Sequence, residues 1–338
     1  MKKVRFGVIG TNNITDWVIQ GGREDERFQL TAVCSRTQER ADEFAAKHNI
    51  PYTYTSLEAM AASNHVDAIY IATPNCCHAS QAILCMSHGK HVLCEKPFAS
   101  NAREVRDMIE AAKKYGVTLM EAMISTLNPN FLQVKEHLPQ LGKLRRYFAS
   151  YCQYSSRYDK FKEGIVLNAF KPELSNGAAM DIGIYTIYPM IALFGRPQSI
   201  EVQGIVLRTG VDGQGTVNFR YPEMDATVLY SKIANSFLPT EIEGENGNLM
   251  MDHIHVASQL DFIPRIPTGQ GQSQQATRQS LGVTLEYSPY YYEVKEFIDL
   301  VVSNVQESSV NTWDNSLATL EVIDEVRRQI GVVYPSDL

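Results

Sequence analysis

The sequence has no cluster of basic residues. Its 338 residues include 31 lysines and arginines against 38 aspartates and glutamates, which gives a formal net charge of −7. Proteins that bind DNA or RNA neutralise phosphates with a basic patch, and neither the overall charge nor any local run supplies one here. We therefore expect no nucleic-acid partner.

Long hydrophobic runs are also missing. No apolar stretch approaches the roughly 18 residues that a membrane-spanning helix needs. The start of the chain carries the charges of a signal peptide, but Arg5 and Gly7 interrupt the apolar segment that should follow, and Asn12 and Asn13 end it. We expect no membrane partner and a cytoplasmic protein.

Cysteines are few, and none forms a Cys-x-x-Cys pair. Six cysteines in a chain of this length favour reduced, buried thiols over a disulfide framework. Several lie near histidines, which raises the alternative of a zinc site in a metal hydrolase. The expected helix and strand point these side chains to different faces, so a zinc site is not completed and we expect no metal. The residues in question are Cys76, Cys77, His78, Cys85, His88, His91 and Cys94.

The first third of the sequence shows a regular alternation of strand and helix patterns. Apolar runs predict strands at 4–9, 30–34, 68–72, 92–94 and 117–120, with helices between them at 14–20, 37–48, 78–88 and 102–114. Such alternation predicts an α/β fold with a doubly wound parallel sheet of the Rossmann type. We assign residues 1–122 to this dinucleotide-binding domain.

A glycine-containing turn follows the first strand and precedes a helix, which is the context of a dinucleotide-binding loop. Gly10 supplies the tight turn, but Asn12 stands where the second glycine of Gly-x-Gly-x-x-Gly belongs, and Thr15 where the third belongs. Asparagine tolerates a left-handed turn. We nevertheless expect its side chain to crowd the pyrophosphate.

The end of the second strand selects the cofactor. An acidic residue there binds the ribose hydroxyl of NAD, whereas an arginine accommodates the 2′-phosphate of NADP. The sequence has Ser35 and Arg36 and no carboxylate. We predict NADP, with NAD possible; the alternative is that Arg36 is a solvated surface arginine.

The strand at 92–94 runs into Glu95, Lys96 and Pro97, and proline cannot continue a central strand. Ligands of open α/β sheets bind beyond the carboxyl ends of the strands, so Lys96 is aimed at a site. An ordinary charged turn is the alternative.

Residues 123–338 form the second predicted domain, of α+β type. Strand patterns separated by turn signals indicate a large open antiparallel sheet, and two helices follow at 290–303 and 316–329. The outer face of an open sheet must be covered, so we expect a homodimer or higher homo-oligomer. The stretch 264–280, rich in Gln, Gly, Ser and Thr, is expected to be a flexible loop. The expected strands are 144–153, 199–207, 215–221, 226–233, 239–244 and 248–252.

Within this domain, the stretch from Gly177 to Tyr185 combines polar and apolar residues in a helical pattern. Asp181 and Tyr185 are four residues apart and would share one face of a helix. A buried aspartate in apolar surroundings needs a partner. The alternative is a helix cap for Asp181 and an interface role for Tyr185.

Taken together, these motifs resemble the Gfo/Idh/MocA family of oxidoreductases over nearly the whole chain. Tyr185, where many members have histidine, is similar to the branch that contains dimeric dihydrodiol dehydrogenase and NADP-dependent xylose dehydrogenase. Position 123 departs from those enzymes, since Met123 replaces an aromatic residue. The segments that carry the resemblance are 7–11, 35–36, 72–75 with His78, 89–97, 120–122, 180–185 and 325–331.

The resemblance implies NAD(P)-linked oxidation of a carbinol, or reduction of its carbonyl, in a sugar, polyol or dihydrodiol-like compound. It implies that Lys96 lies near the reacting oxygen, that Tyr185 transfers the proton, that Asp181 orients a substrate hydroxyl, and that the Lys96–Pro97 peptide is cis. The residues expected to bind the cofactor are Gly10, Thr11, Asn12, Asn13, Ile14, Ser35, Arg36, Thr73, Pro74, Asn75, His78, Glu95 and Lys96.

Two further expectations concern substrate and activity. Polar aromatic residues suit a carbohydrate, which makes Tyr151, Tyr154, Arg157 and Tyr158 candidate sugar-facing residues; a sheet interface is the alternative. Because Asn12 weakens the glycine motif, a non-catalytic NAD(P)-binding regulator or partner protein is the alternative to an enzyme.

Overall fold

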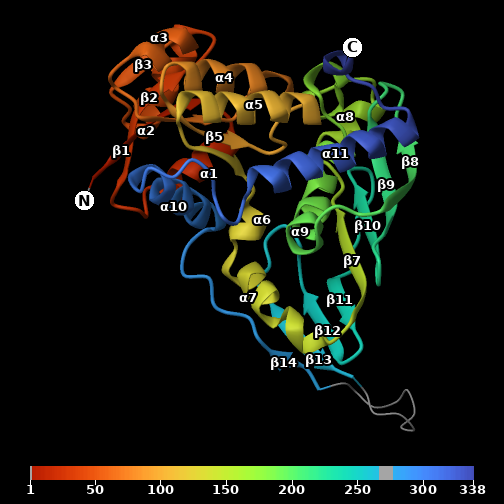
Figure 1. Ribbon diagram of the computed structural model, residues 1–338. Helices are drawn as coiled ribbons and strands as arrows, with labels where there is room; N and C mark the ends of the chain where they lie inside the picture. The colour runs from red at the N-terminus through yellow and green to blue at the C-terminus, as the bar shows by residue number, and fades with distance from the viewer. Residues whose placement is uncertain (1, 266–276) are drawn as a thin grey trace. The chain divides into compact units, whose positions relative to one another are not determined.

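The computed structural model describes residues 2–265 and 277–338, which group into two compact units. The first comprises residues up to Leu127 together with Tyr287–Leu320. The second comprises Asn128–Glu286 and Glu321–Leu338. Figure 1 shows the helices and strands of both units.

The first unit is built on a six-stranded sheet in the order β3-β2-β1-β4-β5-β6, with every neighbouring pair parallel. This is the strand order of the doubly wound dinucleotide-binding fold, so the predicted fold class is confirmed. Its order reverses between β1 and β4, where such sheets bind their ligands. The strands are β1 (Val4–Ile9), β2 (Phe28–Cys34), β3 (Tyr52–Tyr54), β4 (Ala68–Ile71), β5 (His91–Glu95) and β6 (Leu119–Ala122).

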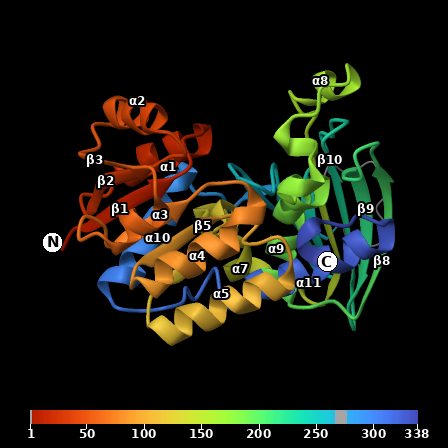
Figure 2. The same ribbon diagram turned by 90° about the horizontal axis from the view of Figure 1, so that it is seen from above.

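Helices cover both faces of this sheet. On one face α4 and α5 lie side by side, next to α3; on the other lie α1 and α10 (Figures 1 and 2). The helices begin at side chains that accept a backbone hydrogen bond, as Thr37 does for α2 and Asn101 for α5. The bounds are α1 (Asn13–Gly22), α2 (Gln38–His48), α3 (Leu57–Ala62), α4 (His78–Ser87), α5 (Ala102–Tyr115), α6 (Ile124–Leu127) and α10 (Pro289–Val302).

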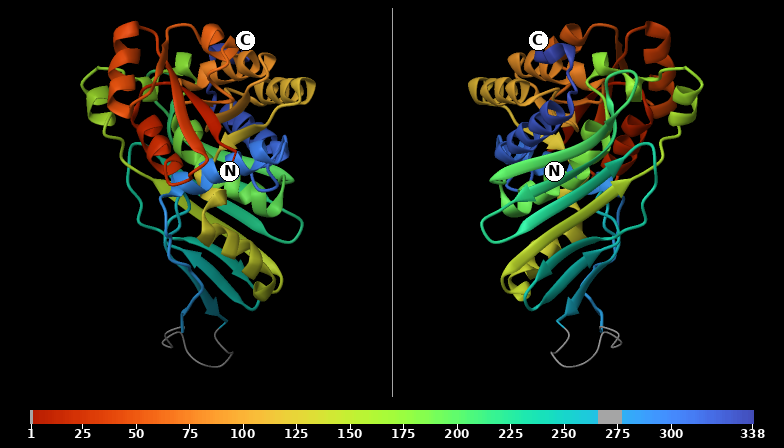
Figure 3. Two further views of the ribbon diagram at one scale, coloured as in Figure 1. Left: turned by 90° about the vertical axis from the view of Figure 1, so that its left-hand side faces the viewer. Right: turned by 90° about the vertical axis from the view of Figure 1, so that its right-hand side faces the viewer.

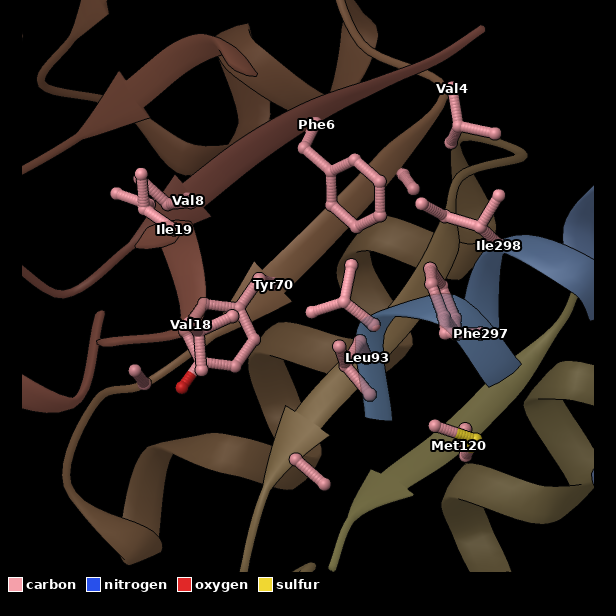
Figure 4. Close-up of a cluster of buried hydrophobic side chains, with 14 of the residues drawn as sticks. Val4, Phe6, Val8, Val18, Ile19, Tyr70, Leu93, Met120, Phe297 and Ile298 are labelled. Carbon is pink, nitrogen blue, oxygen red and sulfur yellow. The ribbon is translucent and has the colours of Figure 1, made fainter. Parts of the chain in front are cut away.

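A buried apolar cluster joins β1 to the helices on one face of the sheet. Phe6 packs against Phe297 of α10, with ring centroids 5.8 Å apart (Figure 4). Val18 and Ile19 of α1 belong to the same cluster. The core of the first unit is therefore completed by a helix that lies about 290 residues later in the sequence.

This packing differs from the predicted domain division at residues 122 and 123. Residues 287–320, assigned to the second domain from the sequence, group with the first unit. The reason is that Val294, Phe297 and Ile298 of α10 are buried against the apolar side of β1 and α1. Sequence order alone does not show which sheet a late amphipathic helix will cover.

The second unit contains an eight-stranded sheet in the order β14-β13-β12-β11-β7-β10-β9-β8. Neighbouring strands are antiparallel except β7 and β10, which are parallel. The expected antiparallel sheet is thus correct but for this pair, because the helical crossover between β7 and β8 returns the chain to the end at which β7 began. The strands are β7 (Leu144–Cys152), β8 (Ser199–Val206), β9 (Asp212–Arg220), β10 (Asp225–Ser231), β11 (Thr240–Gly244), β12 (Gly247–Met251), β13 (Leu260–Pro264) and β14 (Gln279–Ser280).

Alternating burial gives this sheet two different faces. Tyr147 and Ala149 of β7 are buried, whereas Phe148 between them is half-exposed. The right-hand view in Figure 3 looks onto the face that carries no helix of the described chain. The helices of this unit are α7 (Pro129–His137), α8 (Tyr158–Lys162) and α9 (Ile184–Phe194); α11 (Trp313–Ile330) begins in the first unit and ends in the second.

Two expectations about the chain's segments need comment. The stretch 264–280 falls largely outside the described residues, but its ends pair as β13 and β14.

In the second unit, Pro172–Phe194 is one helical stretch that is long and apolar enough to cross a membrane. No such run was expected from the sequence. Most of it is buried within the unit, which is the pattern of a core helix.

Candidate active site

The loop after β1 has the shape of a dinucleotide cradle. Gly10 adopts a φ of +99°, and a Cβ atom there would collide with the carbonyl oxygen of Ala72. Only glycine fits this position. The close approach brings the β1 loop against the end of β4, at the point where the strand order reverses.

The side chain of Asn12, which stands where the second glycine of the motif belongs, is hydrogen-bonded to the protein. Its Oδ1 accepts a 3.2 Å hydrogen bond from the amide of Thr15, and its Nδ2 donates a 2.9 Å bond to the oxygen of Ala72. Asn12 is the N-cap of α1, and its polar atoms are occupied by the protein itself. This position argues against the expectation that the Asn12 side chain crowds the pyrophosphate. The amides of Asn13 and Ile14, which lack intrahelical acceptors, remain at the helix start for an anion.

Arginines stand beside this loop on the side of β2. Arg36 is exposed, directly after Ser35, whose amide donates a 3.0 Å bond to Tyr54. Arg40 was missed in the sequence analysis: its guanidinium donates to the hydroxyl of Thr11 at 2.9 Å and to the Thr11 carbonyl at 2.7 Å. Arg36 precedes the N-cap Thr37 of α2, so helical spacing did not link it to Arg40 in the sequence. Both cations suit a phosphate, so this edge of the unit fits NADP.

The loop after β4 is tied to the loop after β5 by His78. Its Nδ1 lies 2.9 Å from the carbonyl oxygen of Pro97, and its Nε2 lies 2.9 Å from that of Thr73. The ring is only 1% exposed, and burial lowers its pKa. His78 thus lies between the two loops, and its neutral ring donates a hydrogen bond to one of the two carbonyls at a time. Between Thr73 and His78, Pro74 precedes a short 3₁₀ turn that begins at the buried Asn75.

Glu95, Lys96 and Pro97 lie at the carboxyl end of β5. The Lys96–Pro97 peptide is cis, as the resemblance implied. Glu95 is 8% exposed and its Oε1 accepts a 2.6 Å hydrogen bond from the hydroxyl of Tyr70. Burial raises the pKa of Glu95 to about 7. Lys96 follows on a half-buried position at the same edge of the sheet.

The cysteine and histidine residues between positions 76 and 94 do not assemble into a metal site in the structure. Cys85 and Cys94 are fully buried, and burial raises the pKa of both thiols. The sulfurs of Cys76 and Cys77 lie 3.8 Å apart. Across residues 2–265 and 277–338, no group of three or more His, Cys, Asp or Glu residues is placed to hold an ion.

In the second unit, Asp181 lies on a π-helical turn, Ala179–Gly183, that leads directly into α9. The carboxylate of Asp212 accepts hydrogen bonds from the amides of Ala178 (3.0 Å) and Ala179 (2.7 Å) and so fixes the start of the turn. A Cβ atom at Gly177 would collide with this carboxylate. π-helical turns inside α-helices are frequent at functional sites.

Asp181 has a partner that the sequence analysis missed. The ammonium of Lys232, which directly follows β10, lies 2.5 Å from its Oδ2. The Lys232 side chain is 2% exposed and that of Asp181 37%. Lysines are rarely buried unless paired, but one lysine after a strand gives no such signal in a sequence.

Tyr185 lies in a group of rings formed in the second unit. Its ring centroid is 5.6 Å from that of Tyr151 and 6.2 Å from that of His255, and the latter two stack at 4.4 Å. Burial lowers the pKa of His255 to about 4, so its imidazole is neutral at physiological pH. His255 was not predicted. Of the candidate sugar-facing residues, Tyr151 joins this group, whereas Tyr154 and Tyr158 pack against each other near α8.

Two family models match the chain. Residues 4–123 match the model described as an oxidoreductase family with an NAD-binding Rossmann fold, and residues 131–250 match the C-terminal domain of the same family. The chain belongs to the Gfo/Idh/MocA family. The resemblance found in its motifs is thereby confirmed, as is an NAD(P)-dependent oxidoreductase that acts on CH–OH groups.

Individual members of the family cover the chain from end to end. It is 49% identical over 334 residues to the scyllo-inositol 2-dehydrogenase (NADP(+)) IolU of Bacillus subtilis (strain 168), with 99% of each chain covered. It is 32% identical to the trans-1,2-dihydrobenzene-1,2-diol dehydrogenase of Danio rerio, with 92% of each covered. Among solved structures, the aldose-aldose oxidoreductase from Caulobacter crescentus, complexed with glycerol, aligns with a TM-score of 0.83 at 20% identity over 98% of both chains, which bears on the fold alone.

Proposed function

We propose that the chain is an NADP-preferring dehydrogenase that oxidises a ring hydroxyl of a cyclic polyol of the inositol type, or reduces the matching ketone. The observation that carries this proposal is the 49% identity, over 99% of both chains, to an NADP-dependent scyllo-inositol 2-dehydrogenase. The dihydrodiol dehydrogenase relatives are named for a cyclic diol as well. A vicinal ring hydroxyl is the chemical feature that these substrates share.

The residues of the second unit suit a compound with several hydroxyl groups. The paired carboxylate of Asp181 accepts hydrogen bonds from hydroxyls, and the exposed 37% of its side chain leaves it accessible. The stacked rings of Tyr151 and His255 offer a flat apolar surface to the C–H face of a ring polyol. Tyr185, beside this stack, supplies a phenol that exchanges a proton with the reacting hydroxyl.

The residues of the first unit suit NADP. The backbone at Gly10, Asn13 and Ile14 receives the pyrophosphate, and Arg36 with Arg40 receives the 2′-phosphate. The bound cofactor supplies hydride chemistry, so the protein has to position the carbinol and handle one proton. Lys96, at the end of β5, places a positive charge that stabilises the alkoxide character of the reacting oxygen.

We further propose that the open face of the second-unit sheet is a self-association surface and that the protein is a cytoplasmic homodimer or higher homo-oligomer. In support, Phe148, Leu229 and Met250 are half-exposed apolar residues on the outward positions of β7, β10 and β12. Stable dimers bury about 800 Å² per partner. Sedimentation velocity of the purified chain tests this; a monomer at micromolar concentration contradicts it.

The function is tested by a panel of inositol isomers, open-chain polyols, aldoses and dihydrodiols, each supplied with NADP⁺ or NAD⁺. We expect NADPH formation with at least one inositol and little with open-chain polyols, because the stacked rings favour a flat substrate. Oxidation of aldoses alone would contradict the substrate class. Firm cofactor binding with no oxidation in the panel would favour the regulator alternative for this particular chain.

A further inference from the structure

The placement of Lys232 is fixed by its backbone. Its amide donates a 2.8 Å hydrogen bond to Gly213, and its carbonyl accepts a 2.9 Å bond from the amide of Ser155. Gly213 lies within β9, beside the end of β10, and Ser155 lies just beyond the end of β7. The backbone of Lys232 is thus fixed, and its side chain is buried, unlike most lysine side chains.

The ammonium of Lys232 lies nearest Asp181 and also interacts electrostatically with the buried carboxylate of Asp212. Besides the Asp181 oxygen at 2.5 Å, it approaches the carbonyl oxygen of Ala169 at 3.5 Å and the ring centroid of Phe170 at 5.3 Å. An ammonium in such surroundings is costly to bury, and the carboxylate offsets that cost. Apolar residues often fill a buried position with equal or better stability, so an ion pair retained here points to a role for its charge.

Asp181 is held from its own side as well. The π-helical turn that carries it is anchored at Ala178 and Ala179 by the fully buried Asp212. Both partners of the ion pair therefore sit on fixed backbone, anchored at two adjacent residues of β9, Asp212 and Gly213. A nearby cation favours the ionised form of a carboxyl group, and a fixed cation does so in one geometry.

We propose that Lys232 is a positioning residue that keeps Asp181 ionised and aimed, so that Asp181 serves as a hydrogen-bond acceptor for a substrate hydroxyl and leaves proton transfer to Tyr185. The role rests on the proposed dehydrogenase function. It assigns different work to two groups of the second unit: Asp181 binds and orients, and Tyr185 exchanges the proton. No proton is exchanged by Lys232 itself.

The test compares Lys232→Met, Lys232→Arg and Asp181→Asn in the full-length chain, with kcat/KM measured across pH on the polyol that the wild type oxidises best. Lys232→Met is expected to lower kcat/KM at least tenfold at neutral pH and to move the acid limb of the profile to higher pH. Lys232→Arg keeps the charge and should restore the wild-type limb. Lys160→Met, at an exposed ion pair with Glu163, is the control and should match the wild type.

A double variant separates positioning from general damage. If Lys232 acts through Asp181, Lys232→Met should reduce kcat/KM less than about threefold in the Asp181→Asn background. A Lys232→Met loss that is the same at all pH values and undiminished in that background overturns the proposal. If Lys232→Met does not fold, the profile of Lys232→Arg decides: an acid limb that moves to higher pH although the positive charge is kept overturns the proposal. A wild type that oxidises no polyol overturns the proposed function, and this role with it.

Discussion

The phenol of Tyr70 on β4 donates a 2.6 Å hydrogen bond to Glu95 on β5 inside the first unit. Two further glutamates interact electrostatically with Glu95: Glu121 of β6 and Glu293 of α10. Burial raises the pKa of Glu121 to about 7 and that of Glu293 well above its ordinary value. Neither carboxyl oxygen of Glu293 has a hydrogen-bond partner among the described residues. Neighbouring buried carboxyls cannot all ionise, so this group holds protons at neutral pH.

Because the pKa values of Glu95, Glu121 and Glu293 are raised, we expect the stability of the folded chain to fall as the pH rises. Their pKa values are raised in the folded chain, so folding retains protons that the unfolded chain releases above a pH of about 4.3. Stability therefore falls as pH rises towards the raised pKa values, by up to about 1.4 kcal/mol per pH unit for each proton held. Glu293→Gln removes one such proton. Its melting temperature, relative to the wild type, should rise steadily between about pH 5 and pH 8.

Glu296→Gln is the matched control for this experiment. Glu296 lies one turn further along α10, is partly exposed, and accepts a 2.6 Å bond from Ser308. The difference in melting temperature between Glu296→Gln and the wild type should not drift upward with pH. A constant difference for Glu293→Gln as well would show that Glu293 is ionised in the folded chain.

Cofactor selectivity is expected to depend on the arginines beside the glycine loop. Arg36→Ala should weaken NADPH binding relative to NADH by about tenfold, or about 1.4 kcal/mol, and thereby reverse or erase the preference. Arg40→Ala should have the same effect to a smaller extent, because two donors of the Arg40 guanidinium are already bound to Thr11 and fewer remain for a phosphate. Calorimetric titration of both nucleotides measures the gap. Arg328→Ala, with 71% of its side chain exposed on α11, is the control. A wild type that prefers NADH would refute the assignment.

Catalysis and cofactor binding should separate at Lys96 and Tyr185. Lys96→Met and Tyr185→Phe are each expected to leave the NADPH dissociation constant within about threefold of the wild type. Each should lower kcat by about 10²- to 10⁴-fold, since each removes a group that we propose acts on the reacting oxygen. Steady-state kinetics and nucleotide titrations measure the two effects. Tyr115→Phe on α5, at an exposed tyrosine, should retain full activity. Full turnover in either catalytic variant means that its residue has no part in proton transfer or oxygen stabilisation.

Asn12 offers a direct check on the unusual glycine loop. Asn12→Ala loses the N-cap of α1 and the bond to Ala72, which should lower stability by about 1 kcal/mol. Asn12→Gly restores the second glycine of the motif, with Thr15 still at the third position, and should cost only a few tenths of a kcal/mol. We expect Asn12→Gly to change NADPH affinity less than about threefold, because the native side chain is already turned to the protein. A large gain in affinity would mean that Asn12 does obstruct the pyrophosphate.

Local sequence patterns were enough to predict the architecture. Alternating apolar strands and capped helices in residues 4–122 predict the parallel sheet, and five of its six strands begin and end within a few residues of those expected. The three-residue edge strand β3 (Tyr52–Tyr54) was not predicted. Gly10, Arg36, Lys96, Asp181 and Tyr185 could be proposed as site residues because each stands at a fixed offset from a strand end or within a short motif. The five-residue strand β13 and the two-residue edge strand β14 were missed; β14 is too short to carry a periodicity.

The partners of these residues could not be found in the same way. Lys232 pairs with Asp181 across 51 positions, and Glu293 joins Glu95 only because α10 returns to the first unit. Arg40 contacts Thr11 across 29 positions. None of these contacts leaves a pattern in the chain, because burial and pairing arise when distant elements pack.

Lys96 illustrates the division well. The sequence by itself determined that a lysine stands where a buried strand ends and a proline turns the chain, because both features are local. Only the tertiary structure decided what lies beneath that turn: His78 holding Pro97, and Tyr70 holding Glu95. The sequence states which side chain occupies each position. Its electrostatic surroundings depend on burial and on neighbours that only folding brings together.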